Sequence, residues 1–370
     1  MHSTTPPTAL KNGLQLREAG RLPDGRAVQE ITFCLDGMVL SALTYGGIVN
    51  ALYVPDRAGR LANVVLGFDT LDDYVELNKP HFGEIVGRVC NRIAGASFEL
   101  DGRTFTLPRN DGTNCLHGGR GFGARLWEID TARIHDETLG GPAVTLRYVS
   151  ADGEEGFPGR LDVRVTYSLR PGGVWQVDYE ARTDRPTHVN LTHHAYFNLD
   201  GAGSGPALDH VLTVPASRRH DSDAALIPTG DADVAGTPFD FRQPTRIGAR
   251  IHDAHLQLAL AGGYDHHYLL DEPAGDRPRL AARLEAPASG RTLELLTTEP
   301  GVQFYSGNFL DGALRGHGGA AIGRNAAVCL EPQHSPDSPH HPEWPTTVLR
   351  PGEVFRSCSV YRFGVTAGRA

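Results

Sequence analysis

The sequence predicts an all-β fold, a large antiparallel β-sandwich with only short helices. Apolar and polar residues alternate along several segments, helical periodicity is scarce, and 44 glycines and 25 prolines interrupt the chain. Alternation with a period of two places one face of each strand against a core. Many short strands separated by turn residues are typical of two antiparallel sheets that pack face to face.

Turn residues between alternating segments predict three β-hairpins. Residues 161–169 and 175–181 alternate on either side of Pro171-Gly172-Gly173. Asp101-Gly102 separates residues 98–100 from 104–107, and an Asp-Gly pair favours a tight hairpin turn. Residues 280–286 and 292–296 are expected to pair across 288–290, and residues 144–148 read as a further strand.

Helical signals are confined to two short segments. Thr70 is followed three positions later by Asp73, the spacing of a capping box, which predicts a helical turn from residue 71. Ile247, Ile251 and Ala254 have the spacing of a second short helix. Neither segment is long enough to cover a sheet.

Length and composition predict one catalytic β-sandwich domain over residues 1–370, with residues 1–12 as a flexible N-terminal segment. No repeat or composition break marks a linker, and no run approaches the ~18 apolar residues of a membrane span. A net charge of −9 argues against a general nucleic-acid binder, which needs a basic face to offset phosphate charge. A monomer or a homodimer is expected.

The cysteines indicate a reducing compartment. There are five, they are widely spaced, and none forms a C-x-x-C pair. The first residues show no charged segment followed by an apolar stretch, so no secretory signal is expected. We therefore expect reduced thiols and a cytoplasmic location.

Several polar residues stand where chemistry is a reasonable interpretation. Glu331 follows the apolar run 326–330, where a buried strand is expected to end, and a carboxylate there is costly unless it is paired or functional. His193 and His194 lie in an apparent strand, so their side chains point to opposite faces and one at most can reach a shared site. Asp265 is expected in a loop before a strand, where an Asx turn is the ordinary explanation.

Motifs for other chemistries are missing from the sequence. The adjacent pairs His193/His194, His266/His267 and His340/His341 lack the spacing that brings two imidazoles to one metal ion, and there is no H-E-x-x-H. Residues 118–123 are rich in glycine but lack the Lys-Ser/Thr ending of a phosphate-binding loop, and no G-x-S-x-G occurs. We expect no metal and no cofactor.

Taken together in chain order, a set of motifs resembles the aldose 1-epimerase (galactose mutarotase) family. The likeness extends from about Gly25 to Tyr361, and the ordered set is far more specific than any single string. Its main motifs are Gly87-Arg88-x-x-Asn91-Arg92-Ile93, Asn114-x-Leu116-His117-Gly118-Gly119, Asp152-Gly153-Glu154-Glu155-Gly156-Phe157-Pro158-Gly159, His194-x-Tyr196-Phe197-Asn198-Leu199, Tyr264-Asp265-His266 and Leu330-Glu331-x-Gln333-x-x-Pro336-Asp337.

The resemblance implies a galactose mutarotase-like supersandwich that interconverts the α and β anomers of free aldohexoses such as glucose and galactose without a cofactor. It implies that Glu331 is the general base and His194 the general acid. Arg88 belongs to the family's arginine motif, and the resemblance leaves open whether it contacts the sugar or supports Glu331. The other residues expected to line the sugar site are Asn91, Arg92, His117, Tyr196, Asp265 and Gln303.

The chain departs from the family pattern at three positions. His193 and His267 stand where asparagine is common, and Ala195 where serine is common. By strand alternation, His193 and Ala195 share the face opposite His194, so these departures leave the reaction class intact and the preferred sugar open. An aromatic wall for the sugar is expected from Tyr196, Phe122 or Trp127.

Anomer interconversion needs one base and one acid on either side of the anomeric carbon, because one proton leaves the C1 hydroxyl while another reaches the ring oxygen. We expect Glu331 as carboxylate and His194 as imidazolium, held in these states by mutual attraction and by Arg92. Two other classes remain open: a glycoside hydrolase that uses Asp265 and Glu331, and a non-catalytic sugar-binding module. An epimerase of phosphorylated sugars would need cationic groups at the rim, for which Arg120 and Arg125 are candidates.

Overall fold

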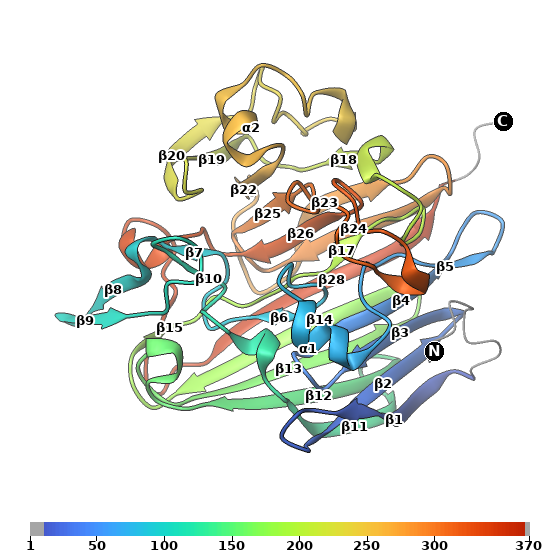
Figure 1. The fold of residues 1–370 in the computed structure, drawn as a ribbon, viewed down its shortest axis with the longest axis horizontal. Helices are drawn as coiled ribbons and strands as arrows, with labels where there is room; N and C mark the ends of the chain where they lie inside the picture. Colours follow the sequence, from blue (N-terminus) through green and yellow to red (C-terminus); the bar gives the residue numbers. More distant parts are fainter. Residues whose placement is uncertain (1–10, 367–370) are drawn as a thin grey trace.

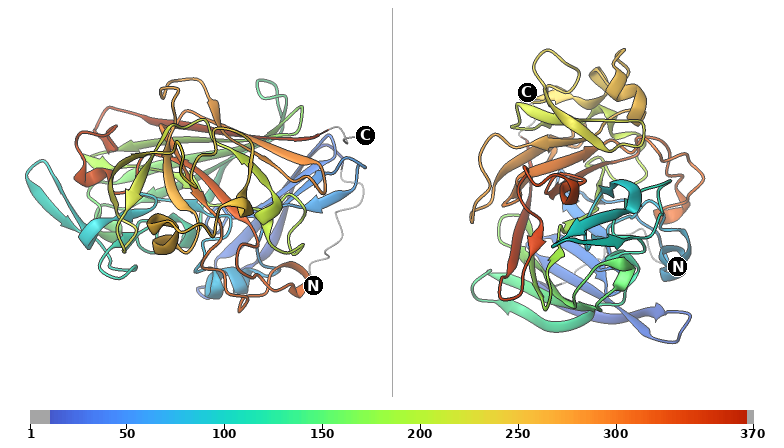
Figure 2. Two further views of the ribbon diagram at one scale, coloured as in Figure 1. Left: turned by 90° about the horizontal axis from the view of Figure 1, so that it is seen from above. Right: turned by 90° about the vertical axis from the view of Figure 1, so that its left-hand side faces the viewer.

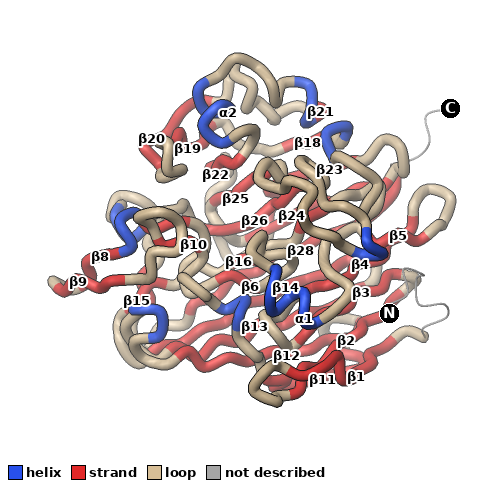
Figure 3. The backbone as a smooth tube through the Cα atoms, in the orientation of Figure 1, coloured by secondary structure: helices blue, strands red, loops and turns tan. Residues whose placement is uncertain are grey.

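The computed structural model describes residues 11–366, which form three large antiparallel sheets and very little helix (Figures 1 and 3). The predicted all-β class is therefore confirmed. Most of the predicted flexible segment, residues 1–10, lies outside the described residues. No helix among residues 11–366 is both long and apolar enough to cross a membrane.

The largest sheet has nine strands, and its C-terminal strand β28 pairs with β14 on one side and with β24 on the other. In spatial order the strands are β11 (Glu128–Asp136), β12 (Gly141–Ser150), β13 (Leu161–Arg170), β14 (Val174–Thr183), β28 (Phe355–Val365), β24 (Arg291–Thr297), β23 (Arg279–Glu285), β18 (Val211–Thr213) and β21 (Thr245–Arg246).

Two further sheets pack with the nine-stranded sheet. The five-stranded sheet is a meander of β1 (Gly13–Arg21), β2 (Ala27–Leu35), β3 (Met38–Leu43), β4 (Val49–Pro55) and β5 (Leu61–Asn63). The six-stranded sheet has the order β17 (Tyr196–Phe197), β26 (Val328–Gln333), β25 (Gly301–Tyr305), β22 (Asp265–Leu269), β19 (Arg218–Ser222) and β20 (Pro228–Asp233).

Short strand pairs and two short helices complete the fold. The helices are α1 (Leu71–Leu77) and α2 (Leu256–Ala261). The strand pairs are β16 (Thr192–His193) with β6 (Ile85–Val86), β10 (Cys115–Leu116) with β7 (Arg92–Ile93), β15 (Thr187–His188) with β27 (Val348–Leu349), and β8 (Ser97–Leu100) with β9 (Arg103–Thr106).

The three predicted hairpins are confirmed. Between β8 and β9, Asp101 and Gly102 have φ values of 50° and 72°, the two positive values that a type I′ turn requires. β13 pairs with β14 from Leu161 opposite Thr183 to Arg170 opposite Val174. The third hairpin joins β23 to β24.

Of the two predicted helices, one is confirmed and one is wrong in position. α1 begins at Leu71, and the Thr70 hydroxyl accepts the Asp73 N–H while donating to the Asp73 carboxylate. Residues 247–249 form a single 3₁₀ turn, and the helix begins at Leu256 instead. There His255 caps the first turn through its ring, and Gly262 ends the helix at a φ of 67°.

A single main core connects the three sheets. Ile31 and Leu52 from the five-stranded sheet, Val163 and Leu293 from the nine-stranded sheet, and Phe304 from the six-stranded sheet belong to one cluster of buried apolar side chains. A shared core supports a one-domain organisation, which stays a prediction.

Loops gathered on one side of the sheets carry the polar motifs. In the view from above in Figure 2, the light blue and cyan segments, which include α1, β6, β7 and β10, lie on one side of the long strands. These loops pair with neighbouring segments in small two-stranded sheets, such as His193 opposite Ile85 and Leu116 opposite Arg92.

Arg88 is a buried structural residue. Its side chain is 2% exposed and lies 5.9 Å from the Phe157 ring. Its guanidinium donates to the Ser150 hydroxyl at 2.9 Å and to the carbonyls of Pro158 and Ala151 at 2.8 Å. These bonds join the loop of residues 87–92 to the end of β12 and the turn that follows it.

We predict that Arg88→Met lowers the free energy of unfolding by about 3 kcal/mol, because buried carbonyl and hydroxyl groups lose their donors. Urea unfolding measures the change as a lower midpoint at constant slope. Arg356→Met is the control, since Arg356 is exposed in a surface ion pair, and it should change stability by less than about 0.5 kcal/mol. Equal effects of the two substitutions would contradict a structural role for Arg88.

Candidate active site

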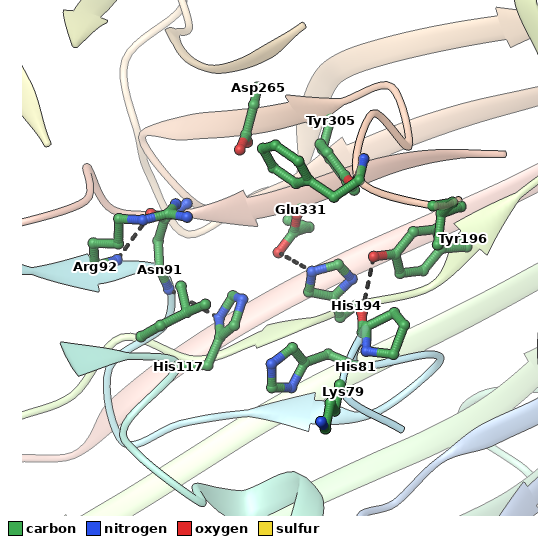
Figure 4. Close-up of a pocket in the computed structure, with 14 residues that line it drawn as sticks. Lys79, His81, Asn91, Arg92, His117, His194, Tyr196, Asp265, Tyr305 and Glu331 are labelled. Atoms are coloured by element: carbon green, nitrogen blue, oxygen red, sulfur yellow. Dashed lines mark hydrogen bonds and ion pairs between the residues drawn. The ribbon is translucent and has the colours of Figure 1, made fainter. Parts of the chain in front are cut away.

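A cavity of about 260 Å³ lies between the six-stranded sheet and the loops that cover it (Figure 4). Polar side chains from several distant segments line it together with aromatic and apolar ones. The lining residues are Lys79, Pro80, His81, Asn91, Arg92, Leu116, His117, His194, Tyr196, Asp265, Tyr305, Phe309, Leu310 and Glu331.

Glu331 lies in the interior of β26, which runs from Val328 to Gln333, and not at the end of a strand as expected. It is opposite Gln303 of β25, and Gln303 is opposite His267 of β22, so the three occupy one row across the sheet. The Glu331 side chain is 2% exposed and its Oε2 has no hydrogen-bond partner among the described residues. A buried carboxyl oxygen without a protein partner is available to a ligand.

His194 points at Glu331, as Figure 4 shows. Its Nε2 lies 3.7 Å from Glu331 Oε2, and its Nδ1 lies 3.6 Å from Cys329 Sγ. The ring also stacks on Tyr196, with centroids 5.0 Å apart and planes 22° apart. Because 3.7 Å is too long for a direct hydrogen bond, both groups retain a site for a substrate oxygen.

His193 points away from this cavity, as strand alternation predicted. Its ring packs edge-on against Trp175 at 4.9 Å and against Tyr167 at 5.7 Å. Ala195 belongs to the main core cluster, while His194 between them lines the cavity. The departures at 193 and 195 are therefore on the side of the core.

Asp265 begins β22 and is not in a preceding loop, so an Asx turn does not explain it. Its Oδ1 accepts a hydrogen bond of 2.7 Å from Gln303 Nε2. Burial raises the pKa of Asp265, while Arg92 and the Gln303 amide oppose that shift. Gln303 is not among the cavity-lining residues, so in this arrangement it positions Asp265.

Asn91 and His117 are joined by reciprocal hydrogen bonds. The Asn91 N–H donates to His117 Nδ1 at 3.1 Å, and the His117 N–H donates to the Asn91 carbonyl at 2.9 Å. Because Nδ1 accepts, the proton of a neutral His117 lies on Nε2. Arg92 is oriented by Asp111, whose carboxylate accepts from its Nε at 2.7 Å.

Of the three expected aromatic candidates, Tyr196 lines the cavity. Its hydroxyl donates to the Pro80 carbonyl at 2.8 Å. Phe122 and Trp127 belong to the main core cluster and do not line the cavity. Tyr305 and Phe309 form a second aromatic element, with centroids 5.7 Å apart and planes 24° apart.

Burial sets the protonation of the central pair. It lowers the pKa of His194 from 6.5 to about 3, with a smaller contribution from His81. Burial also raises the pKa of Glu331 well above 4.5, assisted by Asp265 and opposed by Arg92. Desolvation thus favours the neutral forms of both groups, whereas a carboxylate and an imidazolium were expected.

Two predictions from the sequence concern arginines that do not line the cavity. Arg88 does not line it, and its guanidinium is engaged with Ser150 and two backbone carbonyls, which contradicts a sugar contact. Arg125 is held by Glu154 and Glu155, and neither Arg120 nor Arg125 lines the cavity. The cationic rim proposed for a phosphorylated sugar is therefore not formed by these arginines.

Sequence reasoning missed Lys79, His81, Tyr305 and Phe309. Tyr305 could have been found, because alternation along β25 places it on the face of Gln303. The spacing of His81 and Glu84, three positions apart, could have indicated that the two side chains pair. Lys79 is one of two lysines in the chain, but composition alone does not place it in a site.

Among residues 11–366, one group of side chains is close enough together to hold a metal ion. The ligand atoms of His194, Cys329 and Glu331 lie within 4.8 Å of one another. Because this group contains both central residues, a metal there would compete with any substrate between them. The expectation of a metal-free protein stays a prediction.

Known proteins resemble this chain over most of its length. The sequence matches the family described as aldose 1-epimerase over residues 29–362. It is 42% identical to the galactose mutarotases of Bos taurus and Homo sapiens over 349 residues, which is 94% of this chain and 97% of each relative. It is 36% identical to the aldose 1-epimerase of Escherichia coli K12 over 346 residues, 92% of this chain and 96% of that relative.

Solved structures agree as well. The crystal structure of galactose 1-epimerase from Lactobacillus acidophilus has a TM-score of 0.83 at 26% identity, covering 96% of this chain and 100% of that one. An aldose epimerase homologue from C. elegans has a TM-score of 0.80 at 29% identity, covering 90% and 97%. The resemblance carried by the motifs is confirmed: the chain is an isomerase that belongs to the aldose 1-epimerase family.

Proposed function

We propose that this protein interconverts the α and β anomers of free aldohexoses such as glucose and galactose. The observation that carries the proposal is the pair formed by His194 and Glu331, which face each other at 3.7 Å in one cavity. An acid and a base at this separation match the two oxygens of a hemiacetal. The galactose mutarotase and aldose 1-epimerase relatives support the same reaction.

In the proposed reaction, Glu331 removes the proton of the C1 hydroxyl while His194 gives a proton to the ring oxygen. The bond between C1 and the ring oxygen breaks, and an open-chain aldehyde forms. C1 then rotates about its bond to C2, and ring closure on the other face returns both protons. Each positioned proton transfer is typically worth ~10²–10⁴-fold in rate.

The pair needs only one proton between its members. Desolvation favours the form with that proton on Glu331, which is also the arrangement that exists when the sugar is open. A bound sugar stabilises the charged form, because its C1 hydroxyl donates to the carboxylate and its ring oxygen accepts from the imidazolium. Arg92 adds to this stabilisation of the Glu331 carboxylate.

The remaining polar residues of the cavity are proposed to bind the sugar hydroxyls. Asp265 offers acceptors, Asn91 and Arg92 offer donors, and His117 offers its Nε2–H. Tyr196 and the Tyr305–Phe309 pair supply aromatic surface for the apolar face of the ring.

Two alternatives are less well supported. A hydrolase that uses Asp265 and Glu331 would release reducing ends from an aryl glycoside, and it gives no role to His194 beside Glu331. A sugar-binding module without turnover would bind sugar in a calorimeter but leave the rate of anomer interconversion unchanged, and it needs no acid and base in contact distance.

The cytoplasmic location is likewise proposed. It is supported by the buried thiols of Cys90, Cys115 and Cys329, which are compatible with a reducing compartment. A fluorescent fusion observed in the source cell tests it.

We predict that Glu331→Gln lowers kcat at least 10²-fold, because the amide cannot accept the C1 proton. Polarimetry on freshly dissolved α-glucose and α-galactose measures the rate. Glu299→Gln is a matched control, since Glu299 is a buried glutamate bonded to His334 at 2.7 Å but outside the cavity. Full activity of a folded Glu331→Gln protein would refute the proposed base.

The adjacent histidines provide a second test. His194→Gln should lower kcat by about 10²-fold or more, because the ring oxygen loses its proton donor. His193→Asn should stay within a few-fold of the parent, since His193 packs in the core away from the cavity. Equal losses in both variants, with thermal unfolding unchanged, would argue against a special role of His194.

The pH profile of kcat/KM should be a broad bell, because activity requires one proton on the pair. Below the pKa of His194 both groups are protonated, and above the pKa of Glu331 neither is. Since burial lowers the first and raises the second, the acid limb should lie well below the usual histidine value of 6.5 and the alkaline limb well above 4.5. An acid limb near pH 6.5 would show that His194 titrates as an exposed histidine.

A further inference from the structure

A second histidine–carboxylate pair lies in the wall of the cavity. His81 Nδ1 is 2.6 Å from Glu84 Oε1, and the Asn78 amide donates to Glu84 Oε2 at 3.4 Å. Glu84 is 7% exposed, and a Cβ on Gly123 would overlap its carboxyl group. The absence of a side chain at Gly123 therefore leaves the space that the Glu84 carboxylate occupies.

The segment that carries this pair also holds His194 in place. The His194 N–H donates to the Glu84 carbonyl at 2.9 Å, and the Gly83 N–H donates to the His194 carbonyl at 2.9 Å. The centroid of the His81 ring lies 6.0 Å from that of His194 and 4.6 Å from that of His117 (Figure 4). The three imidazoles therefore form one cluster, in which backbone hydrogen bonds join the segment of His81 to that of His194.

The Glu84 carboxylate stabilises the charged form of His81. Burial lowers the pKa of His81, but the charge and the hydrogen bond of Glu84 outweigh it, so the net shift is upward. The pKa values of His194 and His117 are lowered, by burial first and by the charge of His81 second. Among the described residues, the other titratable or charged groups around the cluster are Lys79, Arg92, His193, Tyr196, Tyr305, Cys329, Asp265 and Glu331, with Tyr45 near Glu84.

We infer that His81 and Glu84 act as positioning residues, which hold a fixed positive charge beside His194 and so make the His194 imidazolium a stronger proton donor. A cation at this distance disfavours a second charge on His194. The ring oxygen of a sugar is a weak base, so a more acidic donor helps its protonation. This inference rests on the proposed function only for its catalytic consequence, because the charge relation exists in the free protein.

Histidine NMR tests the charge relation without turnover. In the parent protein His81 should titrate above the usual histidine pKa of 6.5, with its ¹⁵N signals assigned by their loss in His81→Gln. In Glu84→Gln, the pKa of His81 should fall below 6.5, because burial persists while the stabilising carboxylate is gone. The same pKa for His81 in both proteins would overturn the inference.

The acid limb of kcat/KM tests the effect on His194. His81→Gln and Glu84→Gln should each move the limb upward by about one pH unit. The double variant should shift it no further, since the two residues act as a unit. Loss of packing alone would lower kcat without moving the limb.

Glu343→Gln is the matched control. His341 and Glu343 form a pair of similar length, 2.8 Å, on the surface outside the cavity, so this variant should keep the parent limb. An unmoved limb in folded His81→Gln would refute the inference, as would an equal shift in the control. If the parent protein shows no anomer interconversion, the proposed function fails, whereas the NMR result still decides the charge relation.

Discussion

Desolvation of one acid–base pair is the constraint on which the site depends. Glu331 and His194 are 2% and 5% exposed, so burial disfavours the charged form of each. A sugar has a hydroxyl donor and an ether acceptor, and these can form the hydrogen bonds that Glu331 and His194 do not form with each other. The low dielectric that destabilises the charged forms of Glu331 and His194 also strengthens each polar contact with the substrate.

The six-stranded sheet and the loops that cover it together bury the site. The strands β22, β25 and β26 fix Asp265, Gln303 and Glu331 on one face through their register. Loops fastened by the short pairs β6–β16 and β7–β10 cover this face and supply the imidazoles and Arg92. Because the loops lie over the sheet, the polar groups are held in place while the site stays buried.

Sequence patterns predicted the parts of this protein that depend on local periodicity or on ordered motifs. Alternation gave the three hairpins and the opposite faces of His193 and His194, and the motifs gave both members of the central pair. The direction of the Arg88 side chain was not predictable, because it is decided by carbonyls of β12 and the turn after it. The effect of burial on the pKa values of the pair was also not predictable, since desolvation depends on what covers a residue and not on its neighbours in sequence. His81 escaped because its partners His117 and His194 are distant in the chain.

The position of β28 has a consequence for how the protein is made. This strand is almost the last part of the chain, yet it lies inside the nine-stranded sheet between β14 and β24. During synthesis the two halves of that sheet cannot join until β28 has left the ribosome, so the edges of β14 and β24 stay unpaired until then. A chain that stopped before Phe355 would leave these two edges open in the middle of the largest sheet.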